Sequence, residues 1–306
     1  MRQTASAFAP GSIGNVGPGL DILGLAVAGR GDTVTLTLGD GGGIVVADPG
    51  HRELPTNPRR HTAAIAAQAV FATIGFTSGV SLRLQKGLPL SGGQGGSAAS
   101  AVAGAVAADH LCDARLDAAT LLQCALTAED AVAGRHADNL APSLLGGLVL
   151  VRSLEPMDAI RLPVPMGLRI ILVHPNQQLH TRDARRVLPG SVALGVALAQ
   201  AANVAAMVAG ACLDDAALFG RALDDRIAEP ARAGLLPGFT AAKRAALDAG
   251  AIACSISGAG PTAFALTVDD GTAASIAHAM VTAYAAEGVA AEARIADVDL
   301  QGARIV

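Results

Sequence analysis

The sequence predicts an α+β protein of two domains, and three observations support that fold class. At 306 residues the chain is long enough for two domains of ordinary size, each with its own core. Short alternating apolar runs typical of strands are mixed with longer Ala-rich runs typical of helices, without strict strand–helix alternation. A Pro-rich stretch at 154–165 divides the chain, so we expect domains at 1–155 and 156–306.

Composition limits both the cores and the partners. Hydrophobic residues make up 51% of the chain but aromatic residues only 2%, so the cores must be built from Ala, Val, Leu and Ile. The net charge of −4 offers no basic surface, and we expect no nucleic-acid partner. Four widely spaced cysteines without a C-x-x-C pair indicate free thiols in a reducing compartment. No signal peptide is apparent, so a cytoplasmic protein is expected.

One stretch, 191–213, carries no charged side chain and is long enough to cross a membrane. It also contains Gln200, Asn203 and many Gly and Ala residues, which make it less hydrophobic than a Leu-rich span. We therefore expect a buried core helix here and no membrane partner.

The first predicted domain begins with a Pro/Gly-rich stretch at 8–19 that has no regular pattern. Residues 33–38 alternate Thr with Val or Leu, as half-buried strands do, and we expect 44–47 to be the hairpin partner of that strand. Further strands are expected at 80–84 and 146–152, and helices at 61–74, 97–111 and 116–132.

The second predicted domain has the same mixture of elements. Strands are expected at 168–173, 252–257, 262–268 and 292–295. Helices are expected at 183–188, 192–213, 216–227, 241–249 and 273–286.

A glycine-rich loop between the strand at 80–84 and the helix at 97–111 is the central feature of the chain. It reads Gly-Leu-Pro-Leu-Ser-Gly-Gly-Gln-Gly-Gly-Ser-Ala from position 87. Glycines allow close backbone approach, and a helix start offers unpaired N–H groups and the positive end of its dipole. Phosphate is the usual ligand of such a place. The loop is neither a Walker A sequence nor a complete G-x-G-x-x-G fingerprint, so a simple tight turn is the alternative.

Three other segments place polar residues in predicted loops. Asn15 and Asp21 lie among glycines, where they can approach a ligand or simply stabilise a turn. Glu129, with the polar run 135–139, could supply a carboxylate to Mg²⁺ opposite a phosphate loop, the alternative being a solvated loop. Ser255 to Thr262 is a second glycine-rich turn between apolar strands, which a hairpin would also explain.

Three glycine-containing segments resemble, in this order, the three motifs of the GHMP kinase superfamily. They are the segment that contains Asn15 and Asp21, the glycine-rich loop from position 87, and the turn from Ser255 to Thr262. The phrases His-Ala-Asp-Asn-Leu-Ala-Pro from 136, Thr-Arg-Asp-Ala-Arg-Arg-Val-Leu-Pro from 181 and Ser-Gly-Ala-Gly-Pro-Thr-Ala-Phe from 257 are similar to those of the homoserine kinase family. The phrases Ala-Glu-Pro-Ala-Arg from 228 and Leu-Pro-Gly-Phe from 236 add to the match, which covers essentially the whole chain. The chain departs from the family's nucleotide motif at Ser91, Gln94 and Gly96.

The resemblance implies a two-domain GHMP kinase fold, with an N-terminal ribosomal-protein-S5-like domain and a C-terminal α+β GHMP domain. It implies ATP-dependent phosphorylation of the side-chain hydroxyl of L-homoserine, on the route to threonine, with Mg²⁺ as cofactor and a homodimer as one option. Residues matching the ATP site are Pro89, Leu90, Ser91, Gly92, Gly93, Gln94, Gly95, Gly96, Ser97, Ala98, Ser257, Gly258 and Gly260.

The resemblance also assigns metal and substrate residues. Ser97 and Glu129 match the residues near Mg²⁺. Asn15, Asp21 and His136 match those near the substrate hydroxyl, and Asp138 and Thr181 those near its amino group, with Asn139 beside them. Arg185 and Arg232 match the pair that holds the carboxylate, for which the guanidinium fork is suited.

Two other functions remain open at this stage. Another GHMP small-molecule kinase acting on a different acidic alcohol would also use two arginines. A catalytically silent GHMP protein that senses a metabolite would tolerate the changed nucleotide loop.

Overall fold

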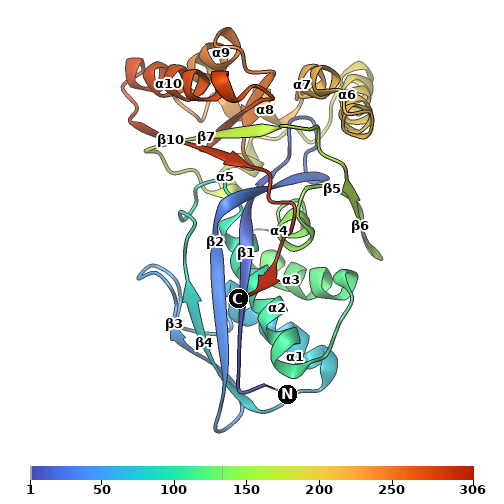
Figure 1. Ribbon diagram of the computed structural model, residues 1–306, viewed down its shortest axis with the longest axis vertical. Helices are drawn as coiled ribbons and strands as arrows, with labels where there is room; N and C mark the ends of the chain where they lie inside the picture. The colour runs from blue at the N-terminus through green and yellow to red at the C-terminus, as the bar shows by residue number, and fades with distance from the viewer. Residues whose placement is uncertain (1, 133) are drawn as a thin grey trace.

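The computed structural model describes residues 2–132 and 134–306, which form two sheets covered by helices (Figure 1). The first sheet has the strand order β11–β1–β2–β4–β3, with β5 pairing with β2 and β6 with β5. Its strands are β1 (Thr4–Gly14), β2 (Leu23–Gly39), β3 (Gly43–Asp48), β4 (Gly79–Gln85), β5 (Leu148–Leu154), β6 (Met157–Leu162) and β11 (Arg304–Ile305).

Small residues let helices pack closely against this sheet. The helices are α1 (Thr62–Ile74), α2 (Gly96–Cys112), α3 (Ala118–Val132) and α4 (Leu140–Leu145). Helix α2 is buried along most of its length, and a Cβ at Gly104 would lie 2.3 Å from the Ala63 carbonyl oxygen of α1. The Ala-rich composition therefore produces a core in which helix backbones nearly touch, as the shortage of aromatic residues requires.

Two expectations for this sheet are wrong. Strand β3 pairs in parallel with β4 and does not form a hairpin with β2, because β4 lies between them and α1 provides the crossover from β3 to β4. The stretch at 8–19, expected to be irregular, is largely strand β1. Its register with β2 shifts between Pro10, which pairs with Gly31, and Gly11, which pairs with Val27, so residues 28–30 of β2 form a bulge opposite β1.

The second sheet is antiparallel, with the order β10–β7–β9–β8; strands β7, β9 and β8 are buried on both faces, and the edge strand β10 is largely exposed. Alternate residues of β7 enter different cores: Ile170 and Leu172 face one, and Ile171 and Val173 face the other. The strands are β7 (Arg169–Pro175), β8 (Ala253–Ile256), β9 (Ala263–Thr267) and β10 (Ala291–Asp297). The helices are α5 (Thr181–Arg186), α6 (Leu194–Cys212), α7 (Ala216–Ala222), α8 (Ala228–Ala233), α9 (Phe239–Asp248) and α10 (Asp270–Ala286).

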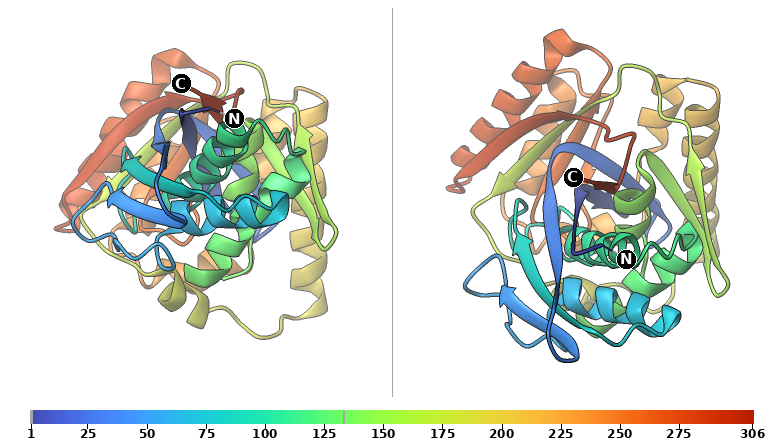
Figure 2. Two further views of the ribbon diagram at one scale, coloured as in Figure 1. Left: turned by 90° about the horizontal axis from the view of Figure 1, so that it is seen from below. Right: turned by 60° about the horizontal axis from the view of Figure 1, so that its bottom comes forward.

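Helix α6 is not the buried core helix that its sequence predicts. It lies at the outer edge of the molecule in both views of Figure 2, with Leu194 74% and Leu198 62% exposed. By length and composition α6 could cross a membrane, but one such helix is weak evidence. The helix lacks charged residues because it consists largely of Ala and Gly. Only one narrow stripe of it is buried, and that stripe includes Gln200 and Met207.

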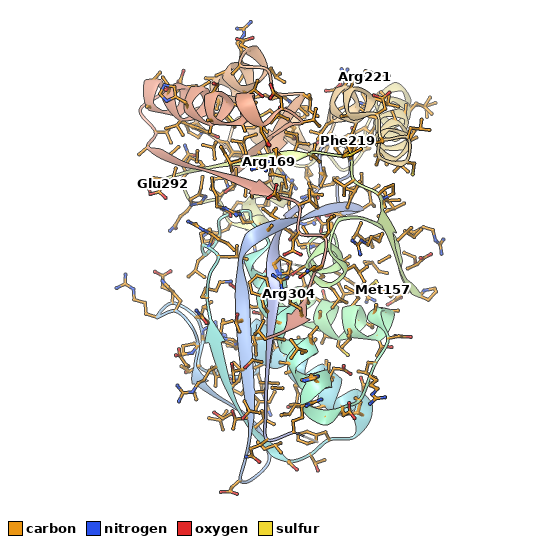
Figure 3. All side chains as sticks on the ribbon, in the orientation of Figure 1. Met157, Arg169, Phe219, Arg221, Glu292 and Arg304 are labelled. Atoms are coloured by element: carbon orange, nitrogen blue, oxygen red, sulfur yellow. The ribbon has the colours of Figure 1, made fainter. Side chains whose placement is uncertain are left out.

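The two halves are tied together at more than one point. One core combines Ile13 and Leu25 of the first sheet with Leu172 of the second. Residues 155 and 156, where we divide the domains, lie in the turn of the β5–β6 hairpin, and that division stays a prediction. The chain then returns to the first sheet, where Arg304 of β11 lies beside β1 with its guanidinium 4.4 Å from the Phe8 ring centre (Figure 3).

Candidate active site

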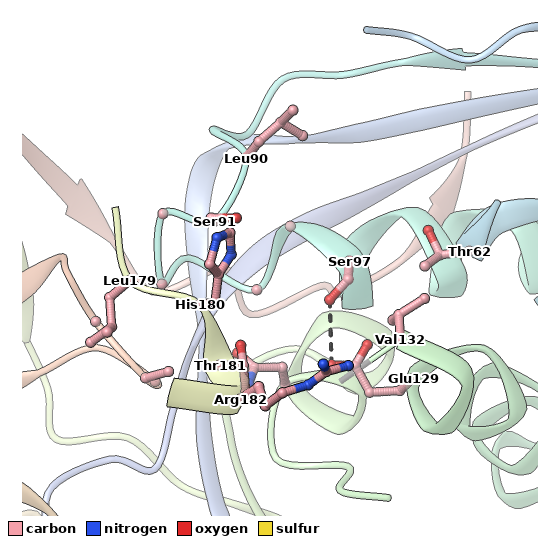
Figure 4. A pocket seen from close by; sticks show the side chains of 18 of the residues that line it. Thr62, Leu90, Ser91, Ser97, Glu129, Val132, Leu179, His180, Thr181 and Arg182 are labelled. Atoms are coloured by element: carbon pink, nitrogen blue, oxygen red, sulfur yellow. Dashed lines mark hydrogen bonds between the residues drawn. The ribbon is translucent and has the colours of Figure 1, made fainter. Parts of the chain in front are cut away.

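A cavity of about 680 Å³ lies where the two halves meet, and Figure 4 shows part of its wall. The first half contributes the start of α2, the end of α3 and the loops after β1 and β4. The second half contributes α5, Arg232 of α8 and the turn between β8 and β9. Residues far apart in the sequence therefore line one cavity.

The glycine-rich loop forms one wall and presents free backbone donors. Gly95 precedes α2 in the left-handed conformation, with φ of 67°, and Gly93 has φ of 70°. None of the backbone N–H groups from Gly92 to Ala98 donates to another group within residues 2–132 and 134–306. Unpaired N–H groups at a helix start attract anions, and the α2 dipole adds to the effect.

A buried ion pair that the sequence analysis missed supports the base of this loop. Lys86 Nζ donates to Asp32 Oδ2 at 2.5 Å and to the Gly96 carbonyl oxygen at 2.7 Å. The other oxygen of Asp32 accepts from Gly87 N–H at 3.0 Å, so the pair holds both ends of the loop. The side chains are 6% and 0% exposed, and burial lowers the pKa of Lys86 while Asp32 opposes that shift. The only sequence signal was a lysine directly before the glycine run.

Beside the start of α2, the side chains of two carboxylates, Glu129 and Asp138, are buried, with exposed fractions of 4% and 2%. The Ser97 hydroxyl donates to Glu129 Oε1 at 3.3 Å (Figure 4), and the buried Glu129 Oε2 has no hydrogen-bond partner among the described residues. His136 Nδ1 lies 3.6 Å from Asp138 Oδ1 and 3.9 Å from Glu129 Oε1. Burial raises the pKa of both carboxyl groups, and the His136 charge opposes the shift.

Asp138 is held by the backbone directly after the end of β1. Its Oδ2 accepts from Asn15 N–H at 2.9 Å, and a Cβ at Gly14 would lie 2.3 Å from that oxygen. The Asn139 side chain accepts from the Ser12 hydroxyl at 2.9 Å. Gly14 therefore allows the side chains of Asp138 and Asn139 to approach the backbone closely.

The two arginines lie in the cavity wall in different states. Arg185 makes a bidentate ion pair with Asp21, at 3.0 and 2.6 Å, which raises the pKa of Arg185, and both side chains are about one third exposed. Arg232 is 2% exposed and donates to the carbonyl oxygens of Ala184 and Gly258. Burial lowers the pKa of Arg232, and neighbouring Arg185 adds to that shift.

The second glycine-rich turn joins β8 to β9 as a hairpin and contacts the first loop directly. The Ser257 hydroxyl donates to the Gly93 carbonyl oxygen at 2.6 Å, and the Thr262 hydroxyl donates to that of Gly92 at 2.5 Å. Ser257 and Thr262 are fully buried. These side chains therefore face the back of the first loop and not the cavity.

The structure gathers most of the predicted site residues around this cavity but leaves three behind its wall. Gln94, Ala98 and Ser257 are buried and do not line it. Predicted residues that line it are Asn15, Asp21, Pro89, Leu90, Ser91, Gly92, Gly93, Gly95, Gly96, Ser97, Glu129, His136, Asp138, Asn139, Thr181, Arg185, Arg232, Gly258 and Gly260. Lining residues not predicted include Arg60, His61, Lys86, His180 and Arg182.

Comparison with protein families gives a class to this fold and cavity. The family described as "GHMP kinases N terminal domain" matches residues 61–147, and the family described as "GHMP kinases C terminal" matches residues 203–286. These matches cover the phosphate-type loop and much of the second half. The protein is a kinase of the GHMP class, and the predicted two-domain α+β GHMP fold is confirmed.

Relatives that match the chain over nearly its whole length show which family of GHMP kinases it belongs to. The chain is 40% identical to a homoserine kinase of Chlorobaculum tepidum, over 99% of this chain and 98% of the relative, and 41% identical to one of Arabidopsis thaliana, over 99% and 85%. The crystal structure of homoserine kinase from Cytophaga hutchinsonii superposes with a TM-score of 0.95 at 40% identity, covering 100% and 98% of the two chains. The chain belongs to the homoserine kinase family.

Proposed function

We propose that this enzyme transfers the γ-phosphoryl group of ATP to the side-chain hydroxyl of L-homoserine, giving O-phospho-L-homoserine on the route to threonine. One observation carries the proposal: a single cavity combines a wall of unpaired backbone N–H groups with two arginines and two buried carboxylates. The first wall suits phosphate, and the others suit a small zwitterion.

ATP phosphates would lie against the loop from Gly92 to Ser97. Glu129 and Ser97 fit Mg²⁺, because the buried Glu129 Oε2 lacks a partner among the described residues and Mg²⁺ needs only one or two carboxylates beside phosphate oxygens. No group of three or more His, Cys, Asp or Glu side chains able to hold a metal occurs in the described ranges, so phosphate would complete this site. When bound, the metal would neutralise phosphate charge.

The amino acid would lie on the opposite side. The carboxylate of homoserine would bind Arg185 and Arg232, and its ammonium group would bind the buried carboxylate of Asp138, near Thr181. The hydroxyl would then lie toward Asn15, Asp21 and His136.

The hydroxyl oxygen would form a bond to the γ-phosphorus as the bond to the ADP oxygen breaks. Its proton would pass to the transferred phosphoryl group, so no side chain need act as a base. Positioning and charge stabilisation can drive such a transfer. We also propose a cytoplasmic location and leave a homodimer as an expectation.

The test is ADP release with Mg·ATP and L-homoserine, homoserinol, mevalonate, shikimate or pantoate. We expect homoserine to be turned over fastest. Arg185→Ala should remove about 2–4 kcal/mol of transition-state binding for homoserine, a roughly 30- to 1000-fold loss in kcat/KM. Homoserinol lacks the carboxylate, so the same change should barely affect its low rate.

Arg226→Ala provides the matched control, because Arg226 forms an exposed ion pair with Asp224 outside the cavity. It should leave both substrates unaffected. If Arg185→Ala reduces kcat/KM equally for homoserine and homoserinol, Arg185 does not bind the substrate carboxylate. Faster turnover of another alcohol would overturn the substrate assignment.

A further inference from the structure

The hydroxyl group of Thr262 contacts three hydrogen-bonding partners behind the glycine-rich loop. Its hydroxyl oxygen lies 2.5 Å from the Gly92 carbonyl oxygen, 2.9 Å from His174 Nδ1 and 3.5 Å from Gln94 Nε2. Thr262 is fully buried in β8–β9 hairpin structure, whereas His174 is half-buried on β7. His174 also packs on the loop itself, since a Cβ at Gly92 would lie 3.4 Å from its Cε1 atom.

The hydrogen bonds at this junction have a defined direction. A hydroxyl has one proton to donate and two lone pairs that accept. The Gly92 carbonyl can only accept, so the Thr262 proton must point to it. His174 must therefore present Nδ1–H to Thr262, and the Gln94 amide can fill the remaining lone pair. The hydroxyl then has all its partners, and its rotamer is fixed from the side of His174.

The direction of the Gly92 carbonyl group determines whether the Gly93 N–H points into the cavity. A trans peptide is planar, so the N–H of one residue points opposite to the carbonyl of the residue before it. Holding the Gly92 carbonyl toward Thr262 turns the Gly93 N–H toward the cavity. Ser257 acts in the same way on the next peptide, because it holds the Gly93 carbonyl and so turns the Gln94 N–H.

We propose that His174 is a positioning residue for nucleotide binding, acting through the Thr262 hydroxyl to hold the Gly93 N–H toward the ATP phosphates. The proposal rests on the proposed function of the loop. The Gln94 amide nitrogen lies 3.5 Å from the same hydroxyl, while the Gln94 Oε1 atom is buried without a partner among the described residues.

The experiment measures Mg·ATP binding by calorimetry without an acceptor alcohol, followed by KM for each substrate. His174→Ala should weaken Mg·ATP binding about tenfold, the effect of one net hydrogen bond. His174→Asn should restore binding to within about threefold, because the Asn amide can donate from a position close to Nδ1. Thr262→Val should weaken binding at least as much as His174→Ala, whereas Thr262→Ser should retain it. KM for homoserine should change by less than about twofold in all four.

The double variant His174→Ala with Thr262→Val should bind Mg·ATP no more weakly than Thr262→Val alone, because both changes break one relay. His278→Ala, an exposed histidine on α10, is the control and should have no effect. Equal weakening by the Ala and Asn changes at His174, or additive effects in the double variant, would overturn the relay. Absence of Mg·ATP binding by the unmodified protein would overturn the proposed function instead, so the two failures are distinct.

Discussion

The two glycine-rich turns look alike in the sequence and differ in the structure. The first, at 87–97, opens a long helix and presents unpaired N–H groups to a cavity. The second, at 257–262, joins two short strands and directs its hydroxyls into the back of the first. Glycine content therefore marks where the backbone must come close, but the following element decides to what. A helix start favours an anion, and a hairpin favours another backbone.

The largest expected effect comes from removing the support of the first turn. Lys86→Met leaves Asp32 as a buried carboxylate without its cation, and breaking a buried pair costs about 3–5 kcal/mol of unfolding free energy. Urea unfolding measures the loss. Arg152→Met breaks the exposed Arg152–Asp158 pair and should cost less than about 1 kcal/mol. Similar small losses in both variants would show that the ion pair does not support the loop.

A second test targets the contact between the turns. A Cβ at Gly93 would lie 2.7 Å from the carbonyl oxygens of Gly260 and Ser257, at a φ of +70°. Gly93→Ala should therefore cost about 2–4 kcal/mol in stability and weaken Mg·ATP binding. Gly258→Ala shares the positive φ but has its nearest neighbour 3.6 Å away, so only about 1–2 kcal/mol of strain is expected. Thermal unfolding of the two variants separates crowding from strain, and equal losses would contradict the close contact.

A smaller effect of opposite sign is expected at Glu129, which accepts a hydrogen bond from Ser97 at the end of the first turn. Burial raises the folded pKa of Glu129 above its unfolded value, so its contribution to stability is present at low pH and is lost as pH rises through the folded pKa. Glu129→Gln should therefore raise the unfolding free energy by about 1–2 kcal/mol at neutral pH while greatly reducing Mg·ATP turnover.

Unfolding at several pH values tests the sign. The difference between Glu129→Gln and the unmodified protein should shrink as pH falls from the raised folded pKa of Glu129 to the ordinary carboxyl pKa, and should change no further below it. A difference that is independent of pH would point to packing and not to the buried charge.

The smallest effect is expected at the second turn. Ser257→Ala removes the donor to the Gly93 carbonyl and should cost about 1 kcal/mol in stability, with a modest rise in KM for ATP. Ser6→Ala is a comparable loss of a hydroxyl at the partly buried Ser6–Thr35 contact, far from the cavity. It should leave KM for ATP unchanged. A KM for ATP that responds equally to both would remove any special role for Ser257.

Local features were predictable, and contacts between distant residues were not. The phosphate-type loop and α2 follow from neighbouring residues, because helix starts and turns depend on nearby sequence. The pairing of β3 with β4 depends on competition between strands, and the exposure of α6 depends on what else packs beside it. Neither is encoded in the segment itself.

The site shows the same division. Motif resemblance located the residues that face the cavity, including Glu129 and Arg185. It missed Asp32 with Lys86, and His174 with Thr262, because these pairs form only when residues 54 and 88 positions apart meet in space. Asp32, Lys86 and His174 lie outside the phrases quoted for the resemblance, and Thr262 lies inside one of them without its contact being apparent there.

The return of the chain to its first sheet also bears on how the protein is made. Strand β1 is among the first segments to leave the ribosome, yet its edge is covered by β11, after the whole second sheet has been translated. During that interval β1 presents unpaired backbone groups, which can pair with other chains. Strand β2 pairs with the other edge of β1, and β11 covers this edge at Ala7 and Phe8. Nascent chains that stop short of Arg304 should therefore be the ones that chaperones bind and that aggregate.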